Sequence, residues 1–330
     1  MGASAALEAL RQSPCHDDTL NLSIKYRRSK ETETGVTPSA SGRSVPKQTP
    51  MTIAAIDYET EYNNRERVPE HIGIKERWSM LATAYRLAGE TRLNQPYGSR
   101  ERLRYDLFQA VDKDAPLIVY IHGGYWQRGD RKDYSFVARE LNANGITVAI
   151  PSYSLCPAVS VMEIGDEIQL CLAALWKHTK KRPTVIGHSA GGHLTAEMLA
   201  RDWSRFAGVP VDLVRTGYAM SGVYDLAPLI RTSLNKALGL TEGTARAASP
   251  LFRPPRPKGR RFVAAVGGDE SEEFKRQSRA IAENWCSVGI DARYEVIAGS
   301  NHFTIVDELI TPGSPALTQI VALAREADAS

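Results

Sequence analysis

The segment PTVIGHSAGGHLTAEMLA, residues 183–200, joins a short apolar run to a helix-forming sequence through the turn GHSAG. Gly-x-Ser-x-Gly between a strand and a helix is the pattern of a nucleophile elbow, which exposes a serine at the carboxyl end of a strand. Gly187 and Gly191 leave room where side chains would clash. The segment therefore predicts Ser189 as a catalytic nucleophile. The alternative is a glycine-rich turn without chemistry.

A second motif, HGGYW, begins at His122 directly after the apolar run PLIVYI. Consecutive glycines let the backbone approach a substrate oxygen and direct N–H groups toward it. We expect an oxyanion hole made by the N–H groups of Gly124, Tyr125 and Ala190. His122 is expected to brace the loop through hydrogen bonds rather than to transfer protons. Trp126 is expected to bind a flat substrate by stacking, and a core position is the alternative.

The remaining partners of a catalytic triad are expected downstream. Beyond the elbow helix the sequence contains one histidine, His302, in a turn after the last expected strand. The order nucleophile, acid, histidine is that of α/β hydrolases. The turn GGDESEEF offers two adjacent acids, Asp269 and Glu270, and spacing alone does not separate them. Asp225, after the preceding expected strand, is a further candidate.

Strand-like and helix-like segments alternate along most of the chain. We expect strands at residues 102–110, 116–121, 146–150, 183–186, 211–220, 261–266 and 293–297, and helices at 132–142, 162–178, 190–203, 272–288 and 316–325. Gly145 is expected at the end of a helix. Strands alternating with crossover helices imply a mostly parallel central sheet with helices on both faces. Together with the order nucleophile, acid, histidine, this pattern predicts an α/β-hydrolase fold.

The first 50 residues differ in composition from the rest. Residues 23–50 are rich in Ser, Thr, Lys, Arg and Glu and contain few large apolar side chains. Such a segment cannot bury enough apolar surface to offset its ordering entropy. We expect residues 1–50 to be a disordered extension, or one that the natural protein lacks because translation starts at Met51. Residues 51–330 are expected to form a single domain.

The composition of the chain argues against several classes of binding partner. The 41 Lys and Arg against 38 Asp and Glu leave a net charge of +3, and no basic stripe suggests nucleic-acid binding. No apolar run approaches the ~18 residues of a membrane span. Four scattered cysteines without a CxxC motif favour a reducing cytoplasm. No cofactor or metal is expected, because His188 and His193 lack the spacing of a helical zinc pair. The partner is a small-molecule substrate, and the oligomeric state is left open, a homodimer included.

HGGYW, GHSAGGHL, GGDESEEFKRQS and NHFTIVDEL together resemble the serine-dependent kynurenine formamidase (arylformamidase) group of α/β hydrolases, relatives of the hormone-sensitive-lipase-like esterases. DYETEYNNRERVPEH and SGVYDLAPL are also similar to that group, so the resemblance covers roughly residues 56–324. In that group the acid precedes a Ser/Thr-x-Glu-Phe segment and is usually Asp. Aligning SEEF with that segment implies Glu270 as the acid.

The resemblance also implies an activity. Members of the group hydrolyse N-formyl-L-kynurenine to L-kynurenine and formate in tryptophan breakdown, without a metal. On this sequence the activity would use a Ser189-His302-Glu270 triad. A carboxylesterase acting on small acyl or aryl esters is the alternative within the same fold, and a catalytically inactive hydrolase fold used for binding is the alternative outside it.

Overall fold

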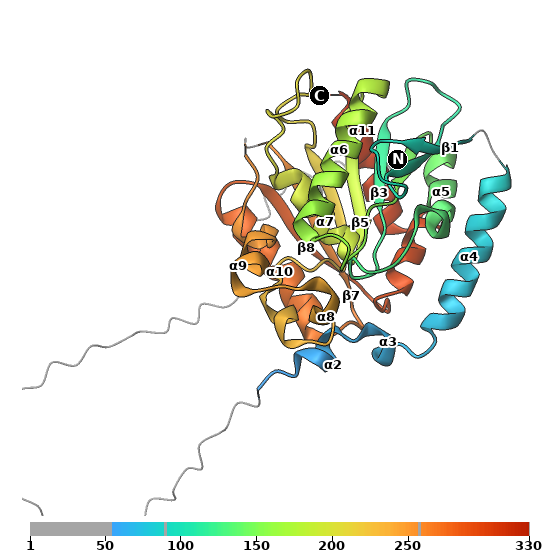
Figure 1. The fold of residues 1–330 in the computed structure, drawn as a ribbon. Helices are drawn as coiled ribbons and strands as arrows, with labels where there is room; N and C mark the ends of the chain where they lie inside the picture. The colour runs from blue at the N-terminus through green and yellow to red at the C-terminus, as the bar shows by residue number, and fades with distance from the viewer. Residues whose placement is uncertain (1–54, 89–90, 257–258, 330) are drawn as a thin grey trace, which may run out of the picture. The chain divides into compact units, whose positions relative to one another are not determined.

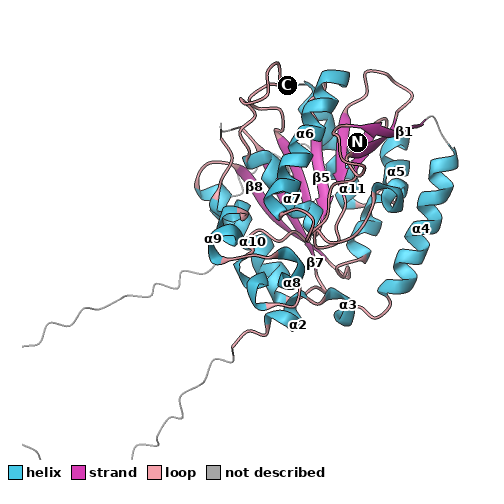
Figure 2. Cartoon of the chain, viewed as in Figure 1, coloured by secondary structure: helices cyan, strands magenta, loops and turns pink. Residues whose placement is uncertain are grey.

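Eight strands form one sheet in the part of the chain that the computed structural model describes, residues 55–88, 91–256 and 259–329 (Figures 1 and 2). In chain order they are β1 (Thr91–Pro96), β2 (Arg104–Phe108), β3 (Leu117–Ile121), β4 (Thr147–Pro151), β5 (Thr184–His188), β6 (Thr216–Met220), β7 (Arg261–Gly267) and β8 (Asp291–Ile297). Their order across the sheet is β1-β2-β4-β3-β5-β6-β7-β8. The expectations for residues 1–50 lie outside the described residues.

The sheet is mostly parallel, as expected. β2 pairs antiparallel with β1 and with β4, whereas every pairing from β4 through β3 to β8 is parallel. Neighbouring parallel strands need long crossover connections, which helices usually provide. Four helices do so here: α5 (Ala138–Ala143), α6 (Val161–Thr179), α7 (Ala190–Ala200) and α10 (Glu272–Ser287).

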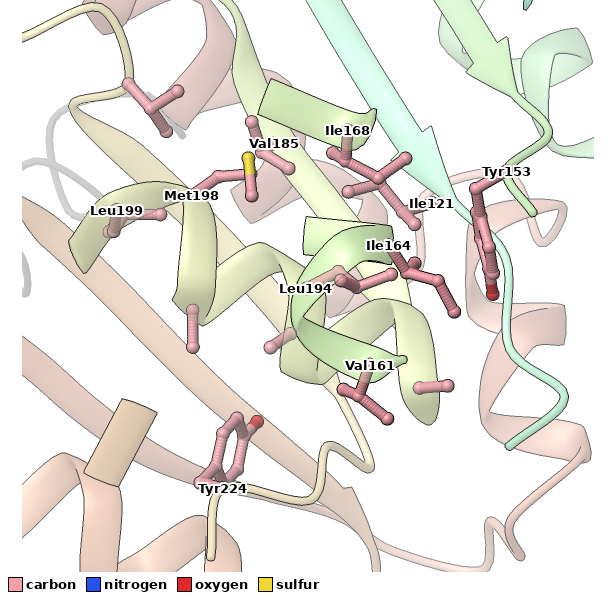
Figure 3. Close-up of a cluster of buried hydrophobic side chains, with 14 of the residues drawn as sticks. Ile121, Tyr153, Val161, Ile164, Ile168, Val185, Leu194, Met198, Leu199 and Tyr224 are labelled. Carbon is pink, nitrogen blue, oxygen red and sulfur yellow. The ribbon is translucent and has the colours of Figure 1, made fainter. Parts of the chain in front are cut away.

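Two hydrophobic cores lie on the two faces of this sheet. On β3, Leu117, Val119 and Ile121 belong to one core, and Ile118 and Tyr120 belong to the other. The first core is built with α6, α7 and α10, and Figure 3 shows part of it, where side chains of α6 and α7 meet those of β3 and β5. Burial on both faces explains why the central strands are apolar without alternation.

The second core is covered by α4 (His71–Ala88), α5 and α11 (Pro315–Ala329). Shorter helices complete the described chain: α2 (Tyr58–Tyr62), α3 (Asn64–Arg67), α8 (Asn235–Leu238) and α9 (Glu242–Ala247), with 3-10 helices η1 (Arg131–Val137), η2 (Ala227–Arg231), η3 (Pro250–Phe252) and η4 (Thr304–Leu309). Figure 1 shows α2 and α3 at the end of the sheet toward which the central strands point.

The carboxyl ends of the parallel strands position the site. Neighbouring parallel strands end at one edge of a sheet, and ligands bind there in open α/β folds. The predicted site residues all follow such strands: HGGYW follows β3, Ser189 follows β5, Glu270 follows β7, and His302 follows β8. The topology therefore gathers segments that are far apart in the sequence.

Several elements differ from the expectations. Neither β1 nor the long helix α4 was expected, and the strand expected at 211–220 is restricted to β6. The helix expected at 132–142 begins as the 3-10 helix η1 and becomes α-helical only in α5. Gly145 does lie just past the end of α5, with φ of +77°. Its left-handed backbone is the conformation that glycine adopts without steric cost.

The state of the cysteines and the length of the helices can be compared with the expectations from composition. The scattered cysteines favoured a reducing compartment, where disulfides are rare, but Cys286 is disulfide-bonded, whereas Cys156 and Cys171 are buried free thiols. Within the described ranges, the helices are too short or too polar to cross a membrane.

Candidate active site

Ser189 lies in a strained turn between β5 and α7. Its φ of 57° and ψ of −118° are a conformation that side chains rarely adopt outside functional turns. A Cβ atom at Gly191 would lie 1.9 Å from the carbonyl oxygen of Ile121, and one at Gly187 would lie 2.3 Å from the carbonyl oxygen of Gly191. Gly191 is therefore required for the elbow to pack against the end of β3, and Gly187 is required for the close approach of the backbone within the elbow.

The structure pairs His302 with Glu270. The Nδ1 atom of His302 lies 2.7 Å from Oε2 of Glu270, and both side chains are buried. Asp269 is exposed to solvent, and only its backbone N–H contacts the histidine turn, at the carbonyl oxygen of Ser300, 3.1 Å away. Asp225 instead caps a turn by accepting the N–H of Ala227 at 3.0 Å. Of the three acids considered, Glu270 is the one that the fold brings to the histidine.

Ser221 holds the other oxygen of Glu270. Its hydroxyl donates to Oε1, and the backbone N–H of Gly267 donates to the same atom at 2.8 Å. Ser221 has a φ of 53° and follows the last residue of β6. Sequence reasoning missed it, although its position directly after the strand beside the elbow strand was a usable signal.

His188, the residue before Ser189, was considered only as a metal ligand. Its Nε2 atom lies 2.6 Å from the carbonyl oxygen of His302, so the ring donates a hydrogen bond there. Burial, and then the proximity of His302, lower the pKa of His188 well below its usual value. The ring thus stays neutral and ties the elbow to the histidine turn.

The HGGYW loop has the backbone expected of an oxyanion loop. Gly124, Tyr125 and Trp126 all have positive φ, at 122°, 51° and 56°. Among the described residues, neither the N–H of Gly124 nor that of Tyr125 meets a backbone acceptor. Ala190 is the first residue of α7, where the geometry of a helix leaves N–H groups without an intrahelical partner.

Tyr125 is fixed by its hydroxyl group. That group donates to the carbonyl oxygen of Tyr62 at 2.6 Å and accepts a bond from the side-chain amide of Asn64 at 3.2 Å. The α2–α3 segment, which contains none of the predicted site residues, thus fixes the position of the loop. Sequence reasoning did not identify this support.

The expectation that Trp126 binds substrate is wrong. Its side chain is completely buried and does not line the cavity described below, whereas Tyr125 does. The indole packs edge-on against His193, with ring centres 5.0 Å apart. The positive φ at Trp126 accompanies a turn that directs this side chain into the core and leaves Tyr125 at the cavity.

His122 braces the loop, as its position suggested. Its Nδ1 atom lies 2.8 Å from the carbonyl oxygen of Gly123, and its ring stacks on Tyr153 with centres 4.4 Å apart. Burial lowers the pKa of His122 to about 4, so the ring is neutral near pH 7. A neutral ring with Nδ1–H donating to a carbonyl supports the loop.

A cavity of about 460 Å³ opens at this edge of the sheet. That volume is in the range of small-molecule sites, ~300–1,000 Å³. Its wall brings together the residues of the two motifs and the histidine turn, Gly123, Gly124, Tyr125, His188, Ser189 and His302, with residues of the α2–α4 segment, Glu59, Tyr62, Asn64, Arg65, Lys75 and Trp78.

Comparison with known proteins agrees with this architecture. A family model described as the alpha/beta hydrolase fold matches residues 118–305. A kynurenine formamidase of Salmo salar is 31% identical over 242 residues, which are 70% of this chain and 81% of that protein. A kynurenine formamidase of Drosophila melanogaster is 29% identical over 64% of this chain and 74% of its own length. The chain therefore belongs to the α/β hydrolases, and within them to the kynurenine formamidase-like group.

Solved structures give the same fold. A thioesterase candidate from Silicibacter sp. tm1040 superposes with a TM-score of 0.73 at 31% identity, over 82% of this chain and all of that one. The carboxylesterase EstE1 superposes with a TM-score of 0.61 at 20% identity, over 79% of this chain and 97% of its own. The second likeness supports the fold alone. The chain is thus a hydrolase by family and by architecture.

Proposed function

We propose that this hydrolase uses Ser189 as its nucleophile and cleaves N-formyl-L-kynurenine to L-kynurenine and formate. The observation that carries the catalytic part is the hydrogen bond between His302 and Glu270 beside a cavity that Ser189 also lines. The choice of substrate is supported by the 31% identity to a kynurenine formamidase.

The hydrogen bond assigns the two nitrogens of the histidine. Because Nδ1–H donates to Glu270, the Nε2 atom of His302 carries the lone pair and serves as the base. It takes the proton of Ser189, and the serine oxygen attacks the formyl carbon. The N–H groups of Gly124, Tyr125 and Ala190 stabilise the resulting oxyanion, and each such donor is worth ~3 kcal/mol.

The remaining steps return the enzyme to its starting state. His302 gives the proton to the aniline nitrogen, the C–N bond breaks, and L-kynurenine leaves a formyl group on Ser189. Water then loses a proton to His302 and attacks the formyl carbon. The bond between that carbon and the Ser189 oxygen breaks, His302 returns the proton to this oxygen, and formate departs. Glu270 stays ionised and stabilises the imidazolium form of the histidine.

A direct assay tests this proposal. The purified protein, treated with a chelator, is incubated with N-formyl-L-kynurenine, and L-kynurenine and formate are measured separately. Equal amounts of both are expected, and Ser189→Ala should lose at least ~10⁴-fold of the rate. Unchanged turnover by Ser189→Ala, or activity that disappears with the chelator, would contradict the mechanism.

A carboxylesterase acting on small esters is the second candidate. An esterase of Gibberella moniliformis is 29% identical over 102 residues, 29% of this chain and 32% of that protein, and EstE1 shares the fold. The triad chemistry would be the same for an ester. The relative rates on a formamide and an aryl ester therefore separate the two candidates.

A further inference from the structure

Three cationic side chains, the cationic cluster, line the cavity beside Ser189: Arg65, Lys75 and Arg128. They come from different segments, namely α3, α4 and the loop that follows HGGYW. The mechanism proposed above uses none of them. Their convergence on one wall calls for a physical explanation, because like charges repel.

Two of the cations are attached to the oxyanion loop. Arg128 packs so closely on it that a Cβ atom at Gly124 would lie 2.2 Å from the carbonyl oxygen of Arg128. Arg65 follows Asn64, whose side-chain amide donates to the hydroxyl of Tyr125 at 3.2 Å. Arg128 and Arg65 therefore both belong to segments that contact the oxyanion loop, and both line the cavity.

The third cation is attached to the histidine turn. The ammonium group of Lys75 lies 5.5 Å from the centre of the Phe303 ring, and Phe303 follows His302 directly. A lysine over an aromatic face gains a cation–π attraction. The cationic cluster thus lines the cavity next to both the oxyanion loop and the histidine turn.

The described part of the chain supplies no ion-pair partner for these charges. Within it, none of the three cations forms an ion pair or a side-chain hydrogen bond. Glu59 and Asp133 also line the cavity, but neither forms an ion pair with a cation of the cluster, and both accept hydrogen bonds from neutral groups. Glu59 accepts the N–H and hydroxyl of Ser233, each at 2.6 Å, and Asp133 accepts the N–H of Asp130 at 3.1 Å.

The electrostatics show the resulting repulsion. Burial lowers the pKa of Lys75, Arg65 and Arg128 lower it further, and Asp133 partly opposes them. Burial and then Arg65 lower the pKa of Arg128. A bound anion would relieve this repulsion, because an opposite charge favours the charged form of each group.

We propose that the cationic cluster binds a carboxylate of the substrate and makes the enzyme selective for carboxylate-bearing substrates over analogues of the same shape that lack the carboxylate. The inference rests on the proposed function and names its substrate class: an aryl formamide that carries a free carboxylate at a distance from the reacting carbonyl. N-formyl-L-kynurenine belongs to this class, whereas formanilide and simple aryl acetates do not.

The test compares N-formyl-L-kynurenine with its carboxamide, which has the same shape without the negative charge. The measured quantity is the ratio of kcat/KM for the acid to that for the amide. The ratio should be at least ~10 in the native enzyme, since a hydrogen bond to a charged group is worth ~1.5–3 kcal/mol. Lys75→Met and Arg128→Met should each lower the ratio about tenfold.

Two controls separate charge from structure. Lys75→Arg keeps the cation and should restore most of the ratio. Lys132→Met removes the same charge from an exposed side chain of η1 outside the cavity wall, and it should leave the ratio unchanged. A native ratio near one, or Lys132→Met lowering it as much as Lys75→Met does, would overturn the carboxylate site.

A second measurement keeps the two proposals distinguishable. L-kynurenine and its carboxamide are compared as inhibitors of 4-nitrophenyl acetate hydrolysis, with the same variants. Stronger inhibition by the carboxylate, lost in Lys75→Met, supports the site even if N-formyl-L-kynurenine is not hydrolysed. Rapid hydrolysis of N-formyl-L-kynurenine with no preference for carboxylates in either assay would leave the function standing and refute the site.

Discussion

The Oε2 atom of Glu270 accepts a hydrogen bond from Nδ1 of His302 across 2.7 Å, in a place where both side chains are buried. This contact joins the turn after β7 to the turn after β8. It occupies Nδ1 of the histidine and leaves Nε2 as the nitrogen to which the proposed mechanism gives the role of base. It also distinguishes between two adjacent acids that the sequence left nearly equivalent.

Glu270→Gln should lower kcat by about 10³- to 10⁴-fold, because a neutral amide neither fixes the tautomer nor stabilises the imidazolium form of His302. Asp269→Asn is the matched control, since this neighbour is exposed and its side chain forms no hydrogen bond with a described residue. Steady-state kinetics on N-formyl-L-kynurenine measure both variants. A larger loss of kcat in Asp269→Asn than in Glu270→Gln would show that Asp269, not Glu270, is the catalytic acid.

Ser221→Ala should lower kcat about tenfold while KM changes little. The variant removes one of the two hydrogen bonds on Oε1 of Glu270, and a bond to a charged group is worth ~1.5 kcal/mol or more. Ser249→Ala is the control, because this buried serine donates to the carbonyl oxygen of Ala245 away from the cavity. It should lower stability without changing kcat; equal kcat losses in both variants would refute a specific role.

Gly191→Ala should prevent formation of an active enzyme, because the new Cβ atom would lie 1.9 Å from the carbonyl oxygen of Ile121. Gly73→Ala is the opposite case. Gly73 lies in α4, and a Cβ atom added there would meet nothing within 4 Å. This variant should gain ~1 kcal/mol from the better helix propensity of alanine. Urea unfolding and activity measure both, and an active, stable Gly191→Ala protein would disprove the close packing of the elbow.

The free energy of unfolding should fall as the pH drops below 6.5. Burial lowers the pKa of His122 to about 4 and that of His193 to about 3. Below pH 6.5 the two histidines are protonated in the unfolded chain but stay neutral in the folded protein. Each histidine therefore lowers the free energy of unfolding by ~1.4 kcal/mol per pH unit until the pH reaches its folded-state pKa. Above pH 6.5 both forms are neutral and neither ring contributes.

Urea unfolding between pH 7 and pH 5 measures this slope. His193→Gln should make the slope shallower, since it removes one buried titrating ring. His178→Gln, on an exposed histidine, should leave it unchanged. A slope that is identical in all three proteins would show that His193 is accessible to protons in the folded state.

Much of this site could be predicted from local patterns. The strand-turn-helix around Ser189 depends on neighbouring residues, because two glycines and an apolar run suffice to define the elbow. The HGGYW loop and the turn of His302 were found for the same reason. Their convergence followed from the rule that parallel strands end at one edge.

The parts that were missed depend on contacts between distant segments. The end of a strand marks Ser221 as a residue near the site, but the local sequence does not show that it reaches Glu270, or that Asn64 reaches Tyr125, because 49 and 61 residues separate them. Trp126 was misplaced since a bulky aromatic beside a glycine pair can turn to either side. The backbone dihedral angles of the loop, which the sequence does not display, decide its direction.

The most direct test of the central claim is the ratio of kcat/KM for N-formyl-L-kynurenine to that for 4-nitrophenyl acetate, measured on the same preparation with Ser189→Ala as the blank. The account predicts that the formamide is preferred, even though the ester has the more reactive carbonyl. A kcat/KM that strongly favours the acetate would contradict the formamidase assignment and leave an esterase with the same catalytic serine.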